Sequence, residues 1–544
     1  MHELPLVSNN YPSSPVMPRK GSRKVRSGCL TCKARRIKCD ETKPACLRCV
    51  NAGRVCQGLD FTSSRLELVQ PRQHVLGDSA SSESRVIEFF CKVAAPSLSG
   101  PIDPYFWTHI VLQFAEHEPA VRHSIITISS LFENRQRHDT FSSSAGQRNV
   151  VALKHYNAAI RELRGAQSPD LVLTLLTCLL FVCIEVLHSN GDVAIQHCYH
   201  GINLLGTCDP PKWALYYLMP IFRRLSILPF YFGDSQPLAD CPALTQPAAT
   251  ADTTFSSYFE AQVSIDAIYN LTIQLFRQTG EYRLGKMRHQ PGPPEIFIEQ
   301  ERIHAHLAQW KSAFERFESE TPIELNSTTK TWRIWPLQQY HVCMALSTVI
   351  VATDETDYDV FIPNFKEMVK GAGELAGLRI RPMTSEFHFE MGFAPFLFFV
   401  AIKCRDFETR IEALRLMGFL CAAQESLWNS RTLQVVAQRI IDLEHGVTTQ
   451  GKSTQYNILP PDENRVRHFV VGHVKTGPDG VVGREISIYM PSEDGGIYIK
   501  REIFSMKRLG ESLDLEVSPG VFAVDLATQK LLMTALEDTN LSSS

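Results

Sequence analysis

The chain has 544 residues, of which 44% are apolar and 21% charged, a composition typical of a globular protein with two or three domains. Its formal net charge is −3, yet residues 1–60 carry +8, which leaves −11 for the remaining 484 residues. A compact basic end on an acidic chain favours a polyanion as the partner of that end alone.

Residues 1–28 are predicted to form a disordered basic arm. Pro12, Pro15 and Pro18 lie among serines, and no apolar stretch here is long enough for a secretory signal. We therefore expect an intracellular protein whose thiols stay reduced. A run of cations typical of a nuclear-import signal or of an arm that contacts DNA phosphates follows. It consists of Arg19, Lys20, Arg23, Lys24 and Arg26.

Residues 29–56 contain six cysteines in two copies of Cys-x2-Cys-x6-Cys, offset by 17 residues. In a reducing compartment this spacing favours metal over a disulfide framework, and metal storage is a further alternative. One zinc with four ligands would leave two thiols over, two separate zincs would need eight, and two zincs that share two thiolates need six. The pattern therefore predicts a binuclear cluster with two zinc ions. Its ligands would be Cys29, Cys32, Cys39, Cys46, Cys49 and Cys56.

The two halves of this motif differ in charge. Between the second and third cysteines the first half reads "KARRIK" and the second half "VNAGRV". Both segments fit a short helix, but only the first carries four cations, so the first helix is predicted to meet nucleic acid. Arginine and lysine can donate to guanine O6 and N7 in the major groove.

This stretch resembles the fungal binuclear zinc-cluster family of DNA-binding proteins, in its six cysteines, its basic run and Lys43-Pro44 before the fourth cysteine. The resemblance implies that the first cysteine of each half bridges the two zincs. The bridging ligands would be Cys29 and Cys46, with Cys32 and Cys39 on one zinc and Cys49 and Cys56 on the other.

The resemblance further implies a double-stranded DNA partner with CGG-type triplets. Arg36 first and Arg35 second are the candidates for base contacts. Phosphate contacts, which position the protein without specifying sequence, are expected from other cations. These are Lys33, Lys38, Lys43 and Arg48. For each of these side chains a solvated surface charge is the alternative.

Residues 57–84 are predicted to be a linker. Gly58, Pro71 and Gly77 interrupt the segment, and no apolar heptad persists. Members of the family commonly dimerise through a coiled coil at this position, so the chain departs from the dimeric pattern. Binding as a monomer and homodimerisation through the helical domain both stay open.

Residues 85–447 have the apolar periodicity of helices joined by short breaks, including a hairpin around Asn190-Gly191. We expect an all-α regulatory domain. The apolar run at 171–184 is 14 residues long, too short for a membrane span of about 20, and is predicted to be a core helix. "SGPIDPYFWTHIVLQFAEHEPAVRHSIITISSL", the hairpin and "WNSRTLQVVAQRIIDLE" resemble the fungal-specific regulatory domain. That branch of the family often acts beside gene clusters for specialised metabolites.

Other chemistry has little support in this region. His188, His197 and His200 lie near one hairpin, but no carboxylate or cysteine completes a metal site, so satisfied or surface histidines are favoured. The motifs HExxH, GxSxG, GxGxxG and the P-loop are absent, and an enzyme is not expected. The cysteines outside the cluster are predicted to be small core residues.

Residues 448–544 are predicted to form a β-rich segment and tail. Alternating residues between glycine-containing turns indicate three strands of a meander from about 465 to 505. The expected fold is thus mainly α: a small zinc cluster, a linker, a large helical domain and a short β-meander.

Together these features predict a nuclear, sequence-specific RNA polymerase II transcription regulator. It would work with the transcription machinery, and the family's habit favours a pathway-specific activator. The alternative is a zinc-stabilised interaction or ligand-sensing module that does not contact bases.

Overall fold

The chain divides into two compact units, residues 1–80 and residues 81–544. The computed structural model describes, of the first unit, residues 32, 35, 37, 39, 47–50 and 52. Of the second unit it describes residues 81–99, 105–137, 143–165, 170–207, 212–228, 254–288, 290–321, 327–379, 386–446, 458–477, 480–492, 496–505 and 522–523. In the first unit, helix α2 spans Leu47–Val50.

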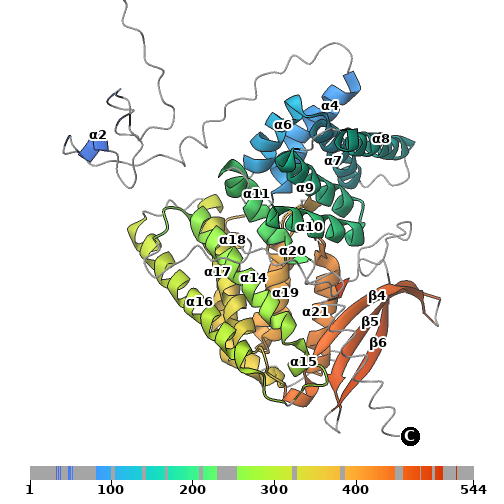
Figure 1. Cartoon of the computed structure of the whole chain (residues 1–544). Coiled ribbons are helices and arrows are strands. Elements are labelled where there is room, and N and C mark those ends of the chain that lie inside the picture. The colour runs from blue at the N-terminus through green and yellow to red at the C-terminus, as the bar shows by residue number, and fades with distance from the viewer. Residues whose placement is uncertain are drawn as a thin grey trace, which may run out of the picture. The chain divides into compact units, whose positions relative to one another are not determined.

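The second unit is mainly helical, with its longer strands near the C-terminal end, as Figure 1 shows, and this confirms the expected fold class. Its N-terminal helices are α4 (Ser81–Phe89), α5 (Ala95–Leu98), α6 (Val111–His117), α7 (Pro119–Arg137), α8 (Ser143–Gly165), α9 (Leu171–Leu187), α10 (Gly191–Gly206) and α11 (Lys212–Leu225), with π-helical turns η1 (Phe90–Ala94) and η2 (Phe106–Ile110). The later helices are α14 (Tyr258–Gln278), α15 (Gly280–Arg283), α16 (Pro294–Glu320), α17 (Ser327–Thr348), α18 (Ile362–Gly377), α19 (Ala394–Lys403), α20 (Phe407–Leu420) and α21 (Ser430–Glu444), with 3₁₀ turns η3 (Glu355–Phe361) and η4 (Asp462–Asn464).

Side-chain caps fix the starts of several helices. The Asp170 carboxylate accepts a hydrogen bond from the Val172 backbone N–H at 2.9 Å at the start of α9. Asp406 caps α20, and Asn429 caps α21. Each cap satisfies a backbone donor that the first helical turn leaves without an intrahelical partner.

The predicted hairpin is confirmed in α9 and α10, which pack against each other across a short connection. The connection includes Ser189 in the left-handed region, at φ 61°, followed by Asn190. The last three turns of α9 are buried all round, which explains why its sequence is almost continuously apolar. The helices pack in groups, α7 on α8 and α9, α14 on α16 and α17, and α19 on α20 and α21.

The predicted β-meander is also confirmed. Strands β4 (His468–Thr476), β5 (Val482–Pro491) and β6 (Ile497–Ser505) pair antiparallel in chain order, and β7 (Phe522–Ala523) pairs with the other edge of β4. A register shift between Val471 and Val474 marks a bulge in β4. In Figure 1 this sheet lies beside α21 and α15. The Arg439–Glu502 ion pair, at 2.6 Å, joins α21 to β6.

The expectation of an all-α region over residues 85–447 was wrong in one respect. A small sheet lies between α18 and α21, in which β1 (Phe387–His388) pairs parallel with β2 (Gln424–Glu425), and β2 pairs antiparallel with β3 (Trp428–Asn429). Strands of two residues have no measurable periodicity, so sequence alternation could not indicate them. Among the described residues, no helix is both long and apolar enough to span a bilayer.

Candidate zinc centre and nucleic-acid interface

Thiols from both halves of the cysteine motif meet in the first unit. Cys32, Cys39 and Cys49 are buried together, and the Sγ atoms of Cys32 and Cys49 lie 3.8 Å apart. A disulfide bond is about 2.05 Å long, so this distance excludes a disulfide between them, and closely grouped thiols are the ligand type that zinc prefers. These residues therefore fit a thiolate zinc centre and carry no disulfide to one another.

In each half the carbonyl oxygen of the second cysteine accepts a backbone hydrogen bond. The Ile37 backbone N–H donates to the Cys32 carbonyl oxygen at 3.1 Å, and the Ala52 N–H donates to the Cys49 carbonyl oxygen at 3.1 Å. The second cysteine of each half thus begins a turn, but the turn is longer in the first half than in the second. The division of ligands between two zincs stays a prediction, in which Cys32 and Cys49 belong to different ions. The remaining predicted ligands, Cys29, Cys46 and Cys56, lie outside the described residues.

Two of the predicted DNA-contacting residues are described. Arg35 is partly exposed, and its Nη1 donates to the carbonyl oxygen of Arg48 at 3.4 Å, so it reaches from the first half to α2 in the second. The Arg48 side chain is exposed. The other predicted contacts lie outside the described residues. These are Arg36, Lys33, Lys38, Lys43 and the arm residues Arg19, Lys20, Arg23, Lys24 and Arg26.

The histidines of the α9–α10 hairpin do not form a metal site. The His197 ring packs edge-on against Phe181 at 5.7 Å between ring centroids, while His188 and His200 are exposed. Among the described residues, no three His, Cys, Asp or Glu side chains are grouped as metal ligands would be. The interpretation of these residues as satisfied or surface histidines is therefore supported.

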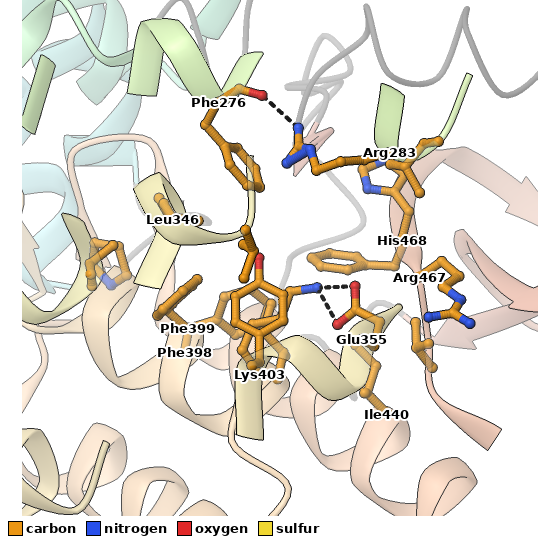
Figure 2. Close-up of a pocket in the computed structure, with 18 of the residues that line it drawn as sticks. Phe276, Arg283, Leu346, Glu355, Phe398, Phe399, Lys403, Ile440, Arg467 and His468 are labelled. Carbon is orange, nitrogen blue, oxygen red and sulfur yellow. Dashed lines mark hydrogen bonds and ion pairs between the residues drawn. The ribbon is translucent and has the colours of Figure 1, made fainter. Parts of the chain in front are cut away.

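The second unit contains a cavity of about 190 Å³ that the sequence did not indicate. It lies among α14, α17, α19, α21 and β4, and Figure 2 shows Leu346, Phe398 and Phe399 on one side of it.

The opposite side of the cavity is charged (Figure 2). Lys403 Nζ lies 2.8 and 2.9 Å from the two carboxylate oxygens of Glu355, and burial lowers the pKa of Lys403. The Arg283 guanidinium stacks on the Phe276 ring, with Cζ 3.3 Å from the ring centroid. His468 is buried, and its Nε2 makes no hydrogen bond to any described residue. Burial, with Lys403 and Arg283 nearby, lowers the pKa of His468 to about 3, so its imidazole is neutral.

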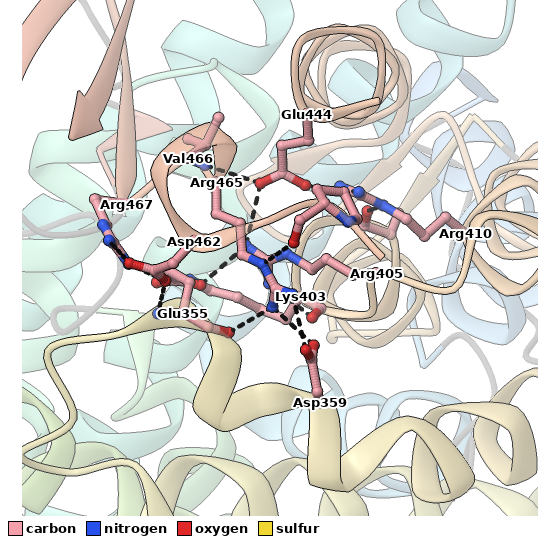
Figure 3. A network of polar contacts seen from close by, with 12 residues as sticks. Glu355, Asp359, Lys403, Arg405, Arg410, Glu444, Asp462, Arg465, Val466 and Arg467 are labelled. Atoms are coloured by element: carbon pink, nitrogen blue, oxygen red, sulfur yellow. Dashed lines mark hydrogen bonds and ion pairs between the residues drawn. The ribbon is translucent and has the colours of Figure 1, made fainter. Parts of the chain in front are cut away.

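A buried ion network adjoins this charged side, as Figure 3 shows. Arg405 donates to Glu355 at 3.0 Å and to Glu444 at 3.1 Å, and Arg410 donates to Glu444 at 2.6 Å. Arg465 binds Asp359 through both terminal nitrogens, at 2.7 and 2.8 Å. These pairs join η3, the α19–α20 connection and the end of α21 to the segment that leads into β4. The network therefore fastens the sheet to the helices.

Comparison with known families finds two domains in this chain. Residues 27–65 match the fungal Zn(2)-Cys(6) binuclear cluster domain, and residues 85–231 match the fungal specific transcription factor domain. The first is a zinc-binding domain, and its match covers the cysteine motif. The chain thus carries both domains of the fungal binuclear zinc-cluster transcription factors, which confirms the resemblance seen in its sequence.

Several curated proteins are similar to the chain. The aspercryptin biosynthesis cluster-specific transcription regulator atnN of Emericella nidulans is 23% identical over 354 residues, 57% of either chain. The transcription regulator lscL of Purpureocillium lilacinum is 27% identical over 203 residues, 32% of this chain and 48% of that protein. The lysine biosynthesis regulatory protein LYS14 of Saccharomyces cerevisiae is 47% identical over 55 residues, 9% of this chain and 7% of that protein.

The chain spans about half the length of the first two of these relatives. No solved structure gives a significant match.

Proposed function

We propose that this protein is a nuclear, sequence-specific DNA-binding regulator of RNA polymerase II transcription. The observation that carries the proposal is the convergence of buried thiols from both half-motifs, within a segment that matches the binuclear cluster domain. Among the similar proteins, one is named as specific to a biosynthesis cluster. The protein would accordingly activate the genes of a pathway that makes a specialised metabolite.

The proposed cluster holds two zinc ions through six thiolates, two of them shared. Six thiolates and two Zn²⁺ sum to a charge of −2, which does not cancel the cations of "KARRIK" and its flanks. We assign base contacts in a CGG-type triplet to Arg36 and then Arg35, and phosphate contacts to Lys33, Lys38, Lys43 and Arg48. The contact of Arg35 with the Arg48 carbonyl would brace the two halves at the DNA surface.

A binding selection tests this proposal. The zinc-loaded full-length protein is incubated with a randomised duplex pool, and the bound duplexes are sequenced. Enrichment of a CGG-type triplet is expected, and Arg36→Ala should remove the preference at one base pair because a bidentate contact is worth about 1–3 kcal/mol of discrimination. Lys38→Ala should weaken all duplexes alike and reduce the salt dependence of binding by about one charge.

Matched controls and outcomes follow from the same selection. Arg302→Ala, which removes an exposed arginine on α16, should leave binding unchanged. Pairs of triplets at fixed spacing would assign a homodimer to the protein, and single triplets a monomer. A protein with two zincs per chain that enriches no sequence would refute the proposal and favour a structural cluster in an interaction module.

A further inference from the structure

We infer that the cavity in the second unit is a binding site for a small aromatic carboxylate. The inference goes beyond the proposed DNA-binding function and does not depend on it. It rests on the shape, the charge and one buried polar atom of the cavity.

The apolar part of the cavity fits an aromatic body. Its wall includes Phe276, Leu346, Phe398, Phe399 and Trp428. Aromatic rings bury a large apolar area and pack against each other in offset or edge-to-face geometry. The cavity volume of about 190 Å³ exceeds that of an engineered cavity of about 150 Å³ that takes up benzene, so one or two fused rings suit it.

The charge of the lining favours an anion. The lining residues comprise four cations and two carboxylates, with His468 neutral, which gives a formal charge of +2. Asp462, just outside the lining, binds Arg467 and reduces this value to +1. A single carboxylate on the ligand would therefore leave the site neutral. Cation–carboxylate hydrogen bonds are among the stronger ones in proteins.

One buried polar atom points to a ligand. His468 is 8% exposed, lines the cavity, and has an Nε2 that no described residue hydrogen-bonds. Buried polar atoms without a partner are rare, because each one forgoes the hydrogen bonds that it would make in water. Figure 2 shows His468 beside Arg283, so a carboxylate that contacts this imidazole would also lie near a guanidinium.

The site is connected to the rest of the unit. Glu355 and Lys403 line the cavity and bind each other, and Arg405 of the buried network donates to the same Glu355 carboxylate. Arg467, on the cavity wall, leads into β4. A ligand at the charged end would thus contact the groups that fasten the sheet to the helices. Binding is expected to stabilise the second unit as well as fill the cavity.

The test measures binding of three naphthalene probes of one shape to the zinc-loaded full-length protein by calorimetry at pH 7.5. The probes are 2-naphthoate, neutral 2-naphthamide and cationic 2-naphthylmethylammonium. We expect saturable binding of 2-naphthoate below about 1 mM, the affinity that usual ligand efficiency gives a molecule of its size. The amide should bind about tenfold more weakly, and the cation should not bind.

Two variants and one control make the result specific. Arg283→Met should reduce 2-naphthoate affinity about tenfold and leave the amide unchanged, while the control Arg302→Met should change neither. Leu346→Trp fills the apolar side and should abolish binding of both; should this variant fail to fold, the Arg283→Met comparison decides alone.

Equal binding of the acid and the amide, an equal loss of both in Arg283→Met, or no saturable binding would overturn the inference. None of these outcomes bears on DNA selection, so the two proposals fail separately.

Discussion

The buried network makes a strong prediction about Glu444. Its side chain has no exposure, and its carboxylate accepts hydrogen bonds from Arg410 at 2.6 Å, Arg405 at 3.1 Å and the Val466 backbone N–H at 2.9 Å. Burial opposes ionisation of this carboxyl, but Arg405 and Arg410 outweigh it and hold its pKa below the ordinary value. Glu444→Gln keeps the volume and removes the charge.

The variant would leave two buried guanidinium groups with too little negative charge. Arg405 would retain Glu355, whereas Arg410 would retain only the carbonyl oxygen of Ala401 among its hydrogen-bond acceptors in the described part of the chain. Removal of one partner of a buried ion pair costs about 3–5 kcal/mol. Because glutamine keeps one acceptor oxygen, a loss of about 3 kcal/mol in the free energy of unfolding is expected.

The measurement is urea unfolding followed by tryptophan emission at pH 7.5, with Glu412→Gln as control. Glu412 binds Arg415 at the same 2.6 Å, but both side chains are exposed, so its loss should cost at most about 1 kcal/mol. The two substitutions are chemically identical, but Glu444 is buried with three donor residues whereas Glu412 is exposed with one. Equal losses in the two variants would refute the reasoning, since they would mean that water reaches the network.

Three further predictions concern packing, pH and zinc. Gly201→Ala should lower the free energy of unfolding by about 1–3 kcal/mol, because the new Cβ would lie 2.4 Å from the buried Phe222 ring. The control Gly206→Ala, on the same helix, places its Cβ where no atom lies within 4 Å and should not destabilise the protein. Equal effects of the two variants in urea titrations would contradict this prediction. Burial lowers the pKa of His388 and His445 to about 4, so on acidification the unfolded chain binds protons before the folded one. The free energy of unfolding should therefore fall as the pH drops below about 6.5, by about 2 kcal/mol per histidine at pH 5. A urea midpoint that does not change between pH 7.5 and pH 5 would contradict this prediction. Zinc chelation should abolish DNA binding. It should leave tryptophan emission unchanged, because all six tryptophans lie in the second unit. Altered emission would show that zinc also stabilises the helical unit.

The parts of this molecule that the sequence predicted are those with a local signal. The α9–α10 hairpin has a long apolar run and an Asn-Gly turn, and the meander has period-two alternation between glycine-containing turns. The cysteine motif is equally local, because six cysteines within 28 residues predict a zinc cluster without any information from the fold.

The cavity and its network could not be predicted because their residues are brought together by packing alone. Arg283 and His468 are 185 residues apart in the chain, yet both line one cavity. Arg405 and Glu444 look like ordinary helix-end charges in the sequence, and only the packed structure buries them completely. The one available signal was weak: Lys403 ends an otherwise continuously apolar helix and Arg405 and Asp406 follow it, where charged groups are forced close to the core.

The cysteines of the two units differ in a way that bears on how zinc is distributed. Zinc binds thiolates, so a thiol whose pKa is raised competes poorly for the metal. In the second unit burial raises the pKa of Cys178 and Cys343 to about 12, of Cys404 to about 11, and of Cys183 and Cys421 well above the ordinary value. These thiols pack as small apolar groups in the core.

The cluster thiols that the structure describes are also buried, but they lie in a basic stretch of the sequence. They lie in a segment with seven lysines and arginines among 28 residues, and positive charge favours the thiolate. We propose that the cations assigned to DNA binding also favour zinc binding by these thiols. A substitution such as Arg35→Glu should then weaken zinc binding as well as DNA binding, whereas Arg35→Lys should preserve zinc binding. Competition with a chelator measures the zinc affinity of the two variants separately from their DNA binding. Equal zinc affinities of Arg35→Glu and Arg35→Lys would mean that the cations contribute to DNA binding alone.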